Sequence, residues 1–194
     1  DDESIDKARR DVPELFGDVQ AGRDAVSRLL NTLIRTQAVE FWPKEVDRRK
    51  ILGLAEGPTL VTVHRGARSY VDRHQMLQWN SVKRSARGWI IRQALRLKDG
   101  DPTSDATAIS VLDKLWDWLL DVGILEEHPQ HPGEFRLPAK RIFVTTRGPW
   151  HRCDRCGAVT IHRMNGTCEM RGCSGLLHPI SDKGLSDEHA ASHR

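Results

Sequence analysis

The chain has 194 residues, of which 29% are charged and 38% hydrophobic, and its formal net charge is +3. This length allows one large domain or two small ones, with a core that does not depend on disulfides or metal. The sequence contains no run of about 18 apolar residues and no signal peptide, so we expect no membrane span and a cytoplasmic protein. The modest net charge does not by itself indicate nucleic acid as a partner. Because the sequence begins at Asp1 without a methionine, we expect a piece of a longer protein.

An N-terminal helical region is expected over residues 1–65. Residues 1–17 carry many charges together with a proline and a glycine, and we expect a lead-in without stable structure. Apolar residues recur at three- and four-residue intervals over 24–41 and predict an amphipathic helix, and a shorter helix is expected over 44–52. The β-branched run at 59–63 predicts a strand or an extended linker.

A winged-helix-like domain is expected over residues 66–147. Residues 69–98 are predicted to form two helices, or one that breaks near Ser85 and Gly88. A turn at 101–105 offers several N-cap residues to a helix that should end at Gly123. A wing should follow, made of a short strand at 124–127, a loop at 128–133, and strands at 135–137 and 141–144. The alternative is a helical domain that merely ends in a hairpin.

Charges are segregated along the sequence. Basic residues concentrate in 65–98, whereas 99–127 is acidic. This pattern indicates either a basic surface or a set of solvated helix faces. The helix expected after residue 104 has an acidic outer face, formed by Asp105, Asp113, Asp117 and Asp121. Such a face repels phosphates, so we do not expect this helix to be a recognition helix.

A basic helix near residue 90 is the predicted nucleic-acid interface. On a helical wheel Trp89, Arg92 and Arg96 lie opposite the apolar residues. An exposed tryptophan among arginines suits stacking beside phosphate contacts, although Trp89 packing against another domain explains it equally well. We therefore expect phosphate contacts from Arg84, Arg87, Arg92 and Arg96, stacking by Trp89, and further contacts from the wing residues Lys140 and Arg141.

All four cysteines of the chain fall in one short segment, spaced Cys153-x2-Cys156-x11-Cys168-x4-Cys173. This spacing, with glycines beside the cysteines, predicts a structural zinc ribbon over 148–180, and two disulfides are the alternative. Four thiolates close the coordination sphere of zinc and leave no position for a catalytic water. Three nearby histidines could replace a cysteine but are expected to be exposed loop residues: His151, His162 and His178. Residues 181–194 are expected to be a flexible tail.

The winged-helix order, the phrase LLDVGILEEHPQHPGEFRLPAKRIFV and the motif CDRCG…CEMRGCSGLL resemble the accessory region of bacterial superfamily 2 DNA helicases of the mitomycin-repair and phage-defence type. The resemblance covers roughly residues 105–178. It implies a winged-helix module and a four-cysteine module that follow two RecA-like motor domains. The motor motifs are absent from this sequence, so the resemblance implies a fragment or subunit that positions DNA for a motor located elsewhere.

Three functional hypotheses follow. The first is a DNA-binding accessory module of a helicase, DNA-repair or antiviral defence complex, with no chemistry of its own. The second is a zinc-stabilised protein-interaction scaffold in which the tryptophans and the ribbon dock onto a partner. The third is a nucleic-acid-processing enzyme with an unrecognised site. No Walker A loop, HExxH motif or GxSxG elbow occurs in the sequence, and we therefore expect a non-enzymatic role.

Overall fold

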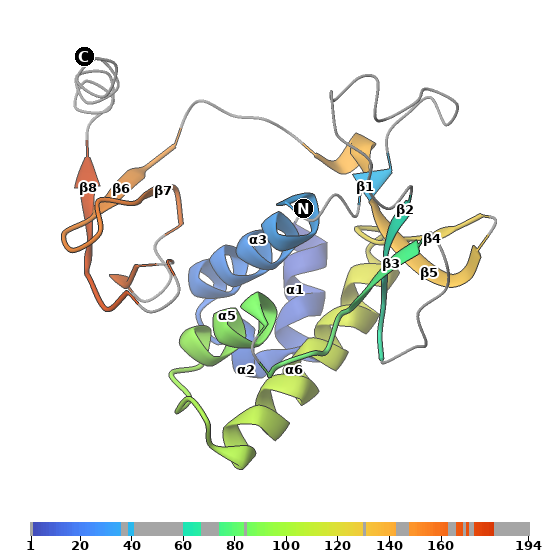
Figure 1. Cartoon of the computed structure of the whole chain (residues 1–194), viewed down its shortest axis with the longest axis horizontal. Coiled ribbons are helices and arrows are strands. Elements are labelled where there is room, and N and C mark those ends of the chain that lie inside the picture. The colour runs from blue at the N-terminus through green and yellow to red at the C-terminus, as the bar shows by residue number, and fades with distance from the viewer. Residues whose placement is uncertain are drawn as a thin grey trace.

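The computed structural model has a helical body that packs against a mixed sheet, and a small second sheet that follows later in the chain (Figure 1). The structure describes residues 2–35, 39–40, 60–66, 74–83, 85–129, 131–142, 148–162, 166–168, 170 and 173–180. The predicted class, mainly α with small β elements, agrees with this arrangement.

Five helices form the body of the described chain: α1 (Asp2–Asp11), α2 (Pro13–Phe16), α3 (Val19–Arg35), α5 (Ala86–Ala94) and α6 (Pro102–Asp121). The ends of α5 and α6 follow from local chemistry. Asp101 caps α6 by accepting a hydrogen bond from the Ser104 amide at 2.8 Å, and Gly123 follows the helix with φ 66°. Ser85 caps α5 by accepting from the Gly88 amide at 3.0 Å. A side chain at Gly88 would meet the backbone of Val82, so only glycine fits this approach.

Two sheets accompany the helices. The larger contains β1 (Val39–Glu40), β2 (Leu60–His64), β3 (His74–Gln78), β4 (Glu126–His128) and β5 (His131–Pro138). Strand β5 pairs antiparallel with β2 and β4 and parallel with β1, whereas β2 and β3 are parallel. A 3-10 turn, η1 (Ala139–Arg141), follows β5. The second sheet has the order β7-β6-β8, made of β6 (Trp150–Cys153), β7 (Val159–Thr160) and β8 (Leu177–Ile180), with β6 antiparallel to both neighbours.

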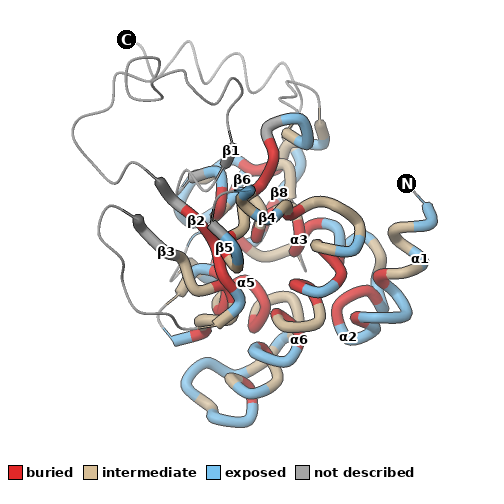
Figure 2. Tube along the Cα trace, turned by 90° about the vertical axis from the view of Figure 1, so that its right-hand side faces the viewer, coloured by how far each residue is buried: buried red, intermediate tan, exposed pale blue. Residues whose placement is uncertain are grey.

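One hydrophobic core lies between the helices and the larger sheet, and the buried segments of α3, α5, α6 and β2 surround it (Figure 2). Trp79, Trp116 and Trp118 are at most 4% exposed within this core. The indole of Trp79 donates to the Leu112 carbonyl at 2.7 Å, and Trp116 meets Phe135 edge-on at 5.0 Å. The core contains residues from both expected N-terminal ranges, 1–65 and 66–147.

Several sequence-based predictions need correction. The first 17 residues form α1 and α2 rather than an unstructured lead-in, because Ala8, Val12 and Phe16 are buried in the core. The first of the two helices predicted within 69–98 is wrong, since β3 pairs with β2 in that segment. The spacing of the apolar residues in this segment is compatible with a helix and with a strand, and the pairing with β2 selects the strand.

Other predictions agree with the structure in part. The amphipathic helix predicted over 24–41 is present as α3, but it begins five residues earlier and ends at Arg35. The strand predicted at 59–63 is β2, and the helix that ends before Gly123 is α6. The predicted hairpin is formed by β4 and β5, with Arg141 in η1 instead of a return strand. The helix expected at 44–52 and residues 143–144 of the return strand lie outside the described residues.

Candidate metal centre and the predicted nucleic-acid residues

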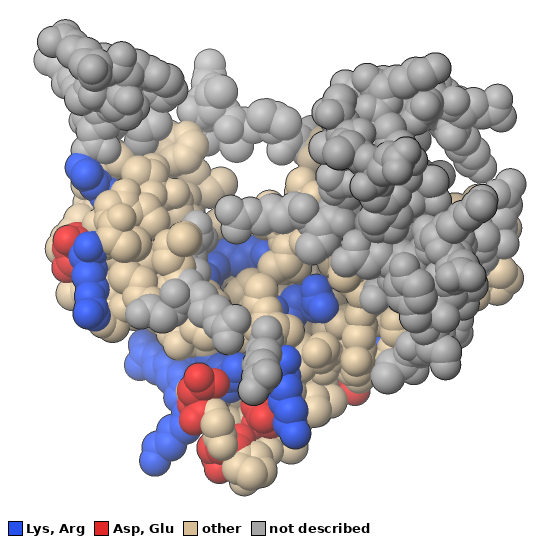
Figure 3. Space-filling model, in the orientation of Figure 1, with Lys and Arg blue, Asp and Glu red and all other residues tan. Residues whose placement is uncertain are grey.

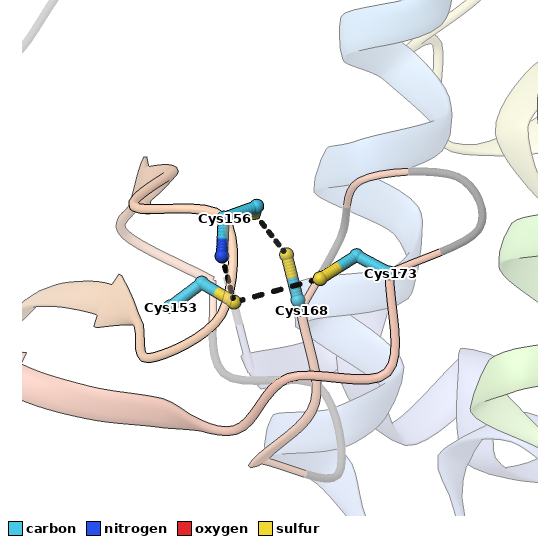
Figure 4. Close-up of side chains that lie close together, drawn as sticks. All are labelled: Cys153, Cys156, Cys168 and Cys173. Carbon is cyan, nitrogen blue, oxygen red and sulfur yellow. Dashed lines mark hydrogen bonds between the residues drawn. The ribbon is translucent and has the colours of Figure 1, made fainter.

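The four cysteine sulfurs converge in the ribbon (Figure 4). All four lie within 4.8 Å of one another, with Cys153–Cys173 at 3.6 Å and Cys156–Cys168 at 3.5 Å. Thiolates placed about 2.3 Å from a tetrahedral ion are separated by about 3.8 Å. The sulfurs are thus near the spacing that a single tetrahedral ion requires, and all four cysteines are free. This arrangement fits a metal ion.

Backbone amides point at the sulfurs. Cys153 Sγ accepts from the amides of Arg155 at 3.4 Å and Cys156 at 3.5 Å. Cys168 Sγ accepts from Met170, and Cys173 Sγ accepts from Gly175, each at 3.4 Å. These N–H groups stabilise negative charge on sulfur, which is the form that binds a metal.

The sulfur environments differ in their effect on the pKa. Hydrogen bonding from the Cys156 amide lowers the pKa of Cys153 to about 7. Burial raises the pKa of Cys168 to about 12. Of these two thiols, Cys153 ionises near neutral pH, whereas Cys168 remains protonated there and would have to lose its proton when a metal ion binds.

Two backbone knuckles hold the cysteines and are tied together. In the first, the Gly157 amide donates to Cys153 O at 3.1 Å, and Gly157 has φ 73°. The Asp154 carboxylate accepts from the Leu176 amide at 2.9 Å, which links this knuckle to the strand after the second. A β-carbon at Gly175 would lie 2.4 Å from Cys153 Sγ. Glycine is therefore required where the second knuckle crosses the first.

The histidines near the cysteines have other surroundings. The described group with metal-binding geometry comprises only the four cysteines. His178 lies 3.5 Å from Asp154, and His162 contacts α3 with its Nε2 3.3 Å from Asn31 Nδ2. His151 is buried, at 6% exposure, on the inner side of the ribbon sheet, and the His162 side chain is only 11% exposed. The prediction of exposed loop residues is therefore wrong for both, whereas His178 is exposed but lies in β8.

Two of the arginines assigned to phosphate binding are not on an exposed face. Arg87 is buried and donates to the carbonyls of Trp79 at 3.1 Å and Gln78 at 2.7 Å, and burial lowers the pKa of its guanidinium. Arg92 is 7% exposed and forms ion pairs with Asp99 at 3.1 Å and Asp105 at 3.0 Å. The helical-wheel prediction of an outward Arg92 is therefore wrong. A helical wheel takes account only of residues in the same helix, whereas the acceptors of Arg92 are the Val82 carbonyl before α5 and a carboxylate on α6.

Trp89 is half-buried, and its ring lies 5.1 Å from the guanidinium carbon of Arg28 on α3. The contact agrees with the alternative in which Trp89 packs against protein instead of a base, and the residue that it packs against belongs to the same chain. Arg84 lies outside the described residues. Lys140 is exposed and pairs with Glu126 at 2.7 Å, and Arg141 is exposed after β5.

The acidic residues of α6 form ion pairs with basic residues from other parts of the chain. Each of the four aspartates on α6 has a basic partner: Arg92 for Asp105, Arg65 for Asp113 and Asp117, and Lys7 for Asp121. Figure 3 accordingly shows basic and acidic atoms side by side where α5 joins α6. The basic and acidic stretches thus neutralise each other, instead of forming one continuous basic face there.

Three exposed basic residues flank α5: Lys83, Arg96 and Lys98. None has an acidic partner within the described ranges. Arg96 has φ 55° and is the only non-glycine residue with positive φ among those described. Its left-handed conformation completes the end of α5, because the Leu97 amide donates to the Arg92 carbonyl at 2.8 Å. The sequence did not single out Lys83 or Lys98.

A polar sheet face was also missed. The register of β2 and β5 places Thr62 and His64 on the same face as Glu134 and Arg136, opposite Val63. Thr62, His64 and Glu134 are at most 7% exposed. The alternation of polar and apolar residues in LVTVH and EFRL is the signal that could have found this face.

Comparisons with protein-family models, with curated proteins and with solved structures found no match to this chain. Within the described residues, the helices are all too short or too polar to cross a bilayer.

Proposed function

We propose that this chain is a nucleic-acid-binding accessory module without chemistry of its own, stapled by one zinc ion, that positions a DNA strand for a motor domain or partner protein. In the order α5, α6, β4 and β5, two helices precede a hairpin whose second strand also pairs with β2, and this agreement with the ending expected of the winged-helix-like domain over 66–147 supports the proposal. The resemblance to helicase accessory regions points the same way.

The observation that carries the proposal is the conformation of Arg96. A left-handed backbone costs a residue with a β-carbon about 1–2 kcal/mol, and glycine is the usual residue at this position of a helix end. Arg96 in this conformation lowers the stability of the fold, and its exposed side chain makes no ion pair within the described residues. Phosphate contact would account for keeping an arginine at that cost.

A salt titration of DNA affinity tests the proposal. Replacing Lys83, Arg96 and Lys98 by serine should weaken binding across sequences, and each lost phosphate contact should lower the log–log salt slope by about 0.9 for duplex DNA. The matched control replaces Arg9 and Arg10, two exposed arginines on α1, and should leave the slope unchanged. Absence of salt-sensitive binding by the unaltered protein would contradict the proposal.

The zinc assignment has its own test. A tetrahedral four-sulfur site suits zinc or a single iron. Purified protein should contain one zinc per chain by elemental analysis and should lack visible thiolate-to-iron absorption. Intact disulfides with no metal would contradict this assignment.

The second candidate, a protein-interaction scaffold, is favoured by one observation. The ribbon exposes three apolar side chains at 38–53%: Val159, Met170 and Leu176. The part of that hypothesis in which tryptophans dock onto a partner does not hold for the three core tryptophans, because they are buried.

A further inference from the structure

The outer face of the ribbon sheet carries aromatic, aliphatic and basic side chains. Strand alternation and register place five residues on this face: Trp150, Arg152, Val159, His178 and Ile180. Trp150 lies opposite Ile180 across β6 and β8, and Arg152 lies between Val159 and His178. We call these five residues the outer ribbon face.

The two sides of this sheet differ in burial. On the inner side, His151 and Thr160 are each 6% exposed, and Cys153 and Leu177 are at most 4% exposed. On the outer ribbon face Trp150 and Ile180 are half-buried, whereas Arg152 is exposed, Val159 is 38% exposed and the His178 side chain is 62% exposed. Figure 3 shows basic atoms, with acidic atoms beside them, along the edge of the ribbon that is turned away from the helices. Cys153 and the small ribbon core therefore lie on one side, and the other side is the more exposed one, most of all at Arg152, Val159 and His178.

We propose that the outer ribbon face binds a single-stranded segment of nucleic acid, with a base stacked on Trp150 and the phosphate backbone at Arg152 and His178. This inference rests on the proposed function and assigns it a second contact surface. Stacking on an aromatic ring needs an unpaired base, whereas the edges of a duplex present no free base face. An aromatic ring beside a guanidinium is the combination that such binding uses.

The size of the face agrees with one or two nucleotides. Strands lie about 4.8 Å apart and alternate residues about 6.6 Å apart, so the face measures about 10 Å by 7 Å. This area is close to that of a base with its sugar and phosphate and is small for a stable protein interface.

The charge of the face also favours a phosphate chain. Asp154 is the only described acidic residue of the ribbon, and its carboxylate is engaged by the Leu176 amide and lies next to His178. Arg152 passes close to the first knuckle, with its Nη2 3.8 Å from the position of a β-carbon at Gly157. The guanidinium thus lies at the rim of the sheet, where it can reach a backbone that runs along the strands.

The test compares a labelled single-stranded oligothymidylate with a duplex of equal length. Trp150→Leu combined with Arg152→Ser should lower single-strand affinity at least about tenfold, because stacking alone contributes about 1–3 kcal/mol per base. Duplex affinity should change much less. Trp150→Phe retains an aromatic ring and should bind nearly as the unaltered protein does. Zinc content, measured for each variant, verifies that the ribbon is intact.

The outcomes separate this inference from the proposed function. If the Trp150 and Arg152 variant binds the single strand normally while the Lys83, Arg96 and Lys98 variant is weakened, the outer ribbon face is not a binding surface and the module still binds nucleic acid. If the unaltered protein shows no salt-sensitive binding to either probe, both proposals fail. If Trp150→Phe loses as much affinity as the variant with both Trp150→Leu and Arg152→Ser, stacking is not the mechanism and this inference is overturned.

Discussion

Arg92 and Arg96 lie one helical turn apart at the end of α5, and their surroundings are opposite. Arg92 is buried among a carbonyl and two carboxylates, whereas Arg96 is exposed in a left-handed conformation. The sequence assigned both to one face. The helix ends between them, so the wheel that relates their directions no longer applies at Arg96.

Arg92→Ala should lower the free energy of unfolding by about 3 kcal/mol, because removal of one partner leaves Asp105 without its buried counterion. Asp99→Ser is the matched control and should cost less than about 1 kcal/mol, since Asp99 is 85% exposed. Urea denaturation of the two variants measures both values. Equal and small losses would show that Arg92 is not held by this network.

Arg96→Gly should raise the free energy of unfolding by about 1 kcal/mol, because glycine adopts the left-handed conformation without steric cost. Arg96→Ala keeps the β-carbon and should give no such gain. The same glycine variant should bind DNA less tightly than the unaltered protein. A gain in stability without any loss of affinity would remove Arg96 from the proposed interface.

At the scale of elements, local signals were reliable where a single cause decides the structure. Asp101 and Gly123 delimit α6 by capping, and the cysteine spacing located the ribbon. The strand at residues 74–78 could not be predicted from the local sequence, because it forms by pairing with β2, which lies elsewhere in the chain. The burial of Arg87 was equally hidden, since its acceptors are the carbonyls of Gln78 and Trp79 in the segment that was misassigned.

The crossing of the two knuckles predicts a strong effect at Gly175. Gly175→Ala should lower metal affinity at least tenfold, because its β-carbon would collide with Cys153 Sγ. Gly166→Ala serves as a control for backbone strain: Gly166 has a positive φ of 70°, which Gly175 does not have, but nothing lies within 4 Å of the added carbon. Competition with a chromogenic chelator measures both affinities. A loss at Gly175 no larger than that at Gly166 would contradict a specific effect of the contact with Cys153 Sγ.

The metal centre should respond to acid. Metal binding displaces the protons of the thiols, and burial gives Cys168 a pKa of about 12 in the metal-free site. Affinity should therefore fall as the pH falls, and it should fall more steeply below about 7, where Cys153 also becomes protonated. A series of chelator competitions across pH measures this slope. Affinity that does not depend on pH would contradict the thiolate ligand set.

At the scale of the whole molecule, the described residues form two separate hydrophobic clusters. One belongs to the helical body and the larger sheet, and the other consists of Cys153, Cys168 and Leu177 with their neighbours in the ribbon. The ribbon touches α3 through His162, which lies 3.3 Å from Asn31 and 4.0 Å from Asp24. These contacts are polar, and each part has its own hydrophobic cluster among the described residues, so the stability of each part should depend mainly on its own core.

Removal of the metal should therefore unfold the ribbon and leave the helical body folded. A strong chelator should abolish the dispersion of the ribbon amide signals in NMR spectra, because a hydrophobic cluster of three buried residues cannot replace the coordination energy of an ion. Far-ultraviolet circular dichroism should lose little helical signal, since the described helices all precede residue 122. Cys156→Ser should reproduce the chelator's effect, whereas Ser174→Ala, which removes only the hydroxyl that accepts from Arg155, should retain the metal. Loss of the helical signal together with the metal would show that the ribbon and the helical body fold as one cooperative unit.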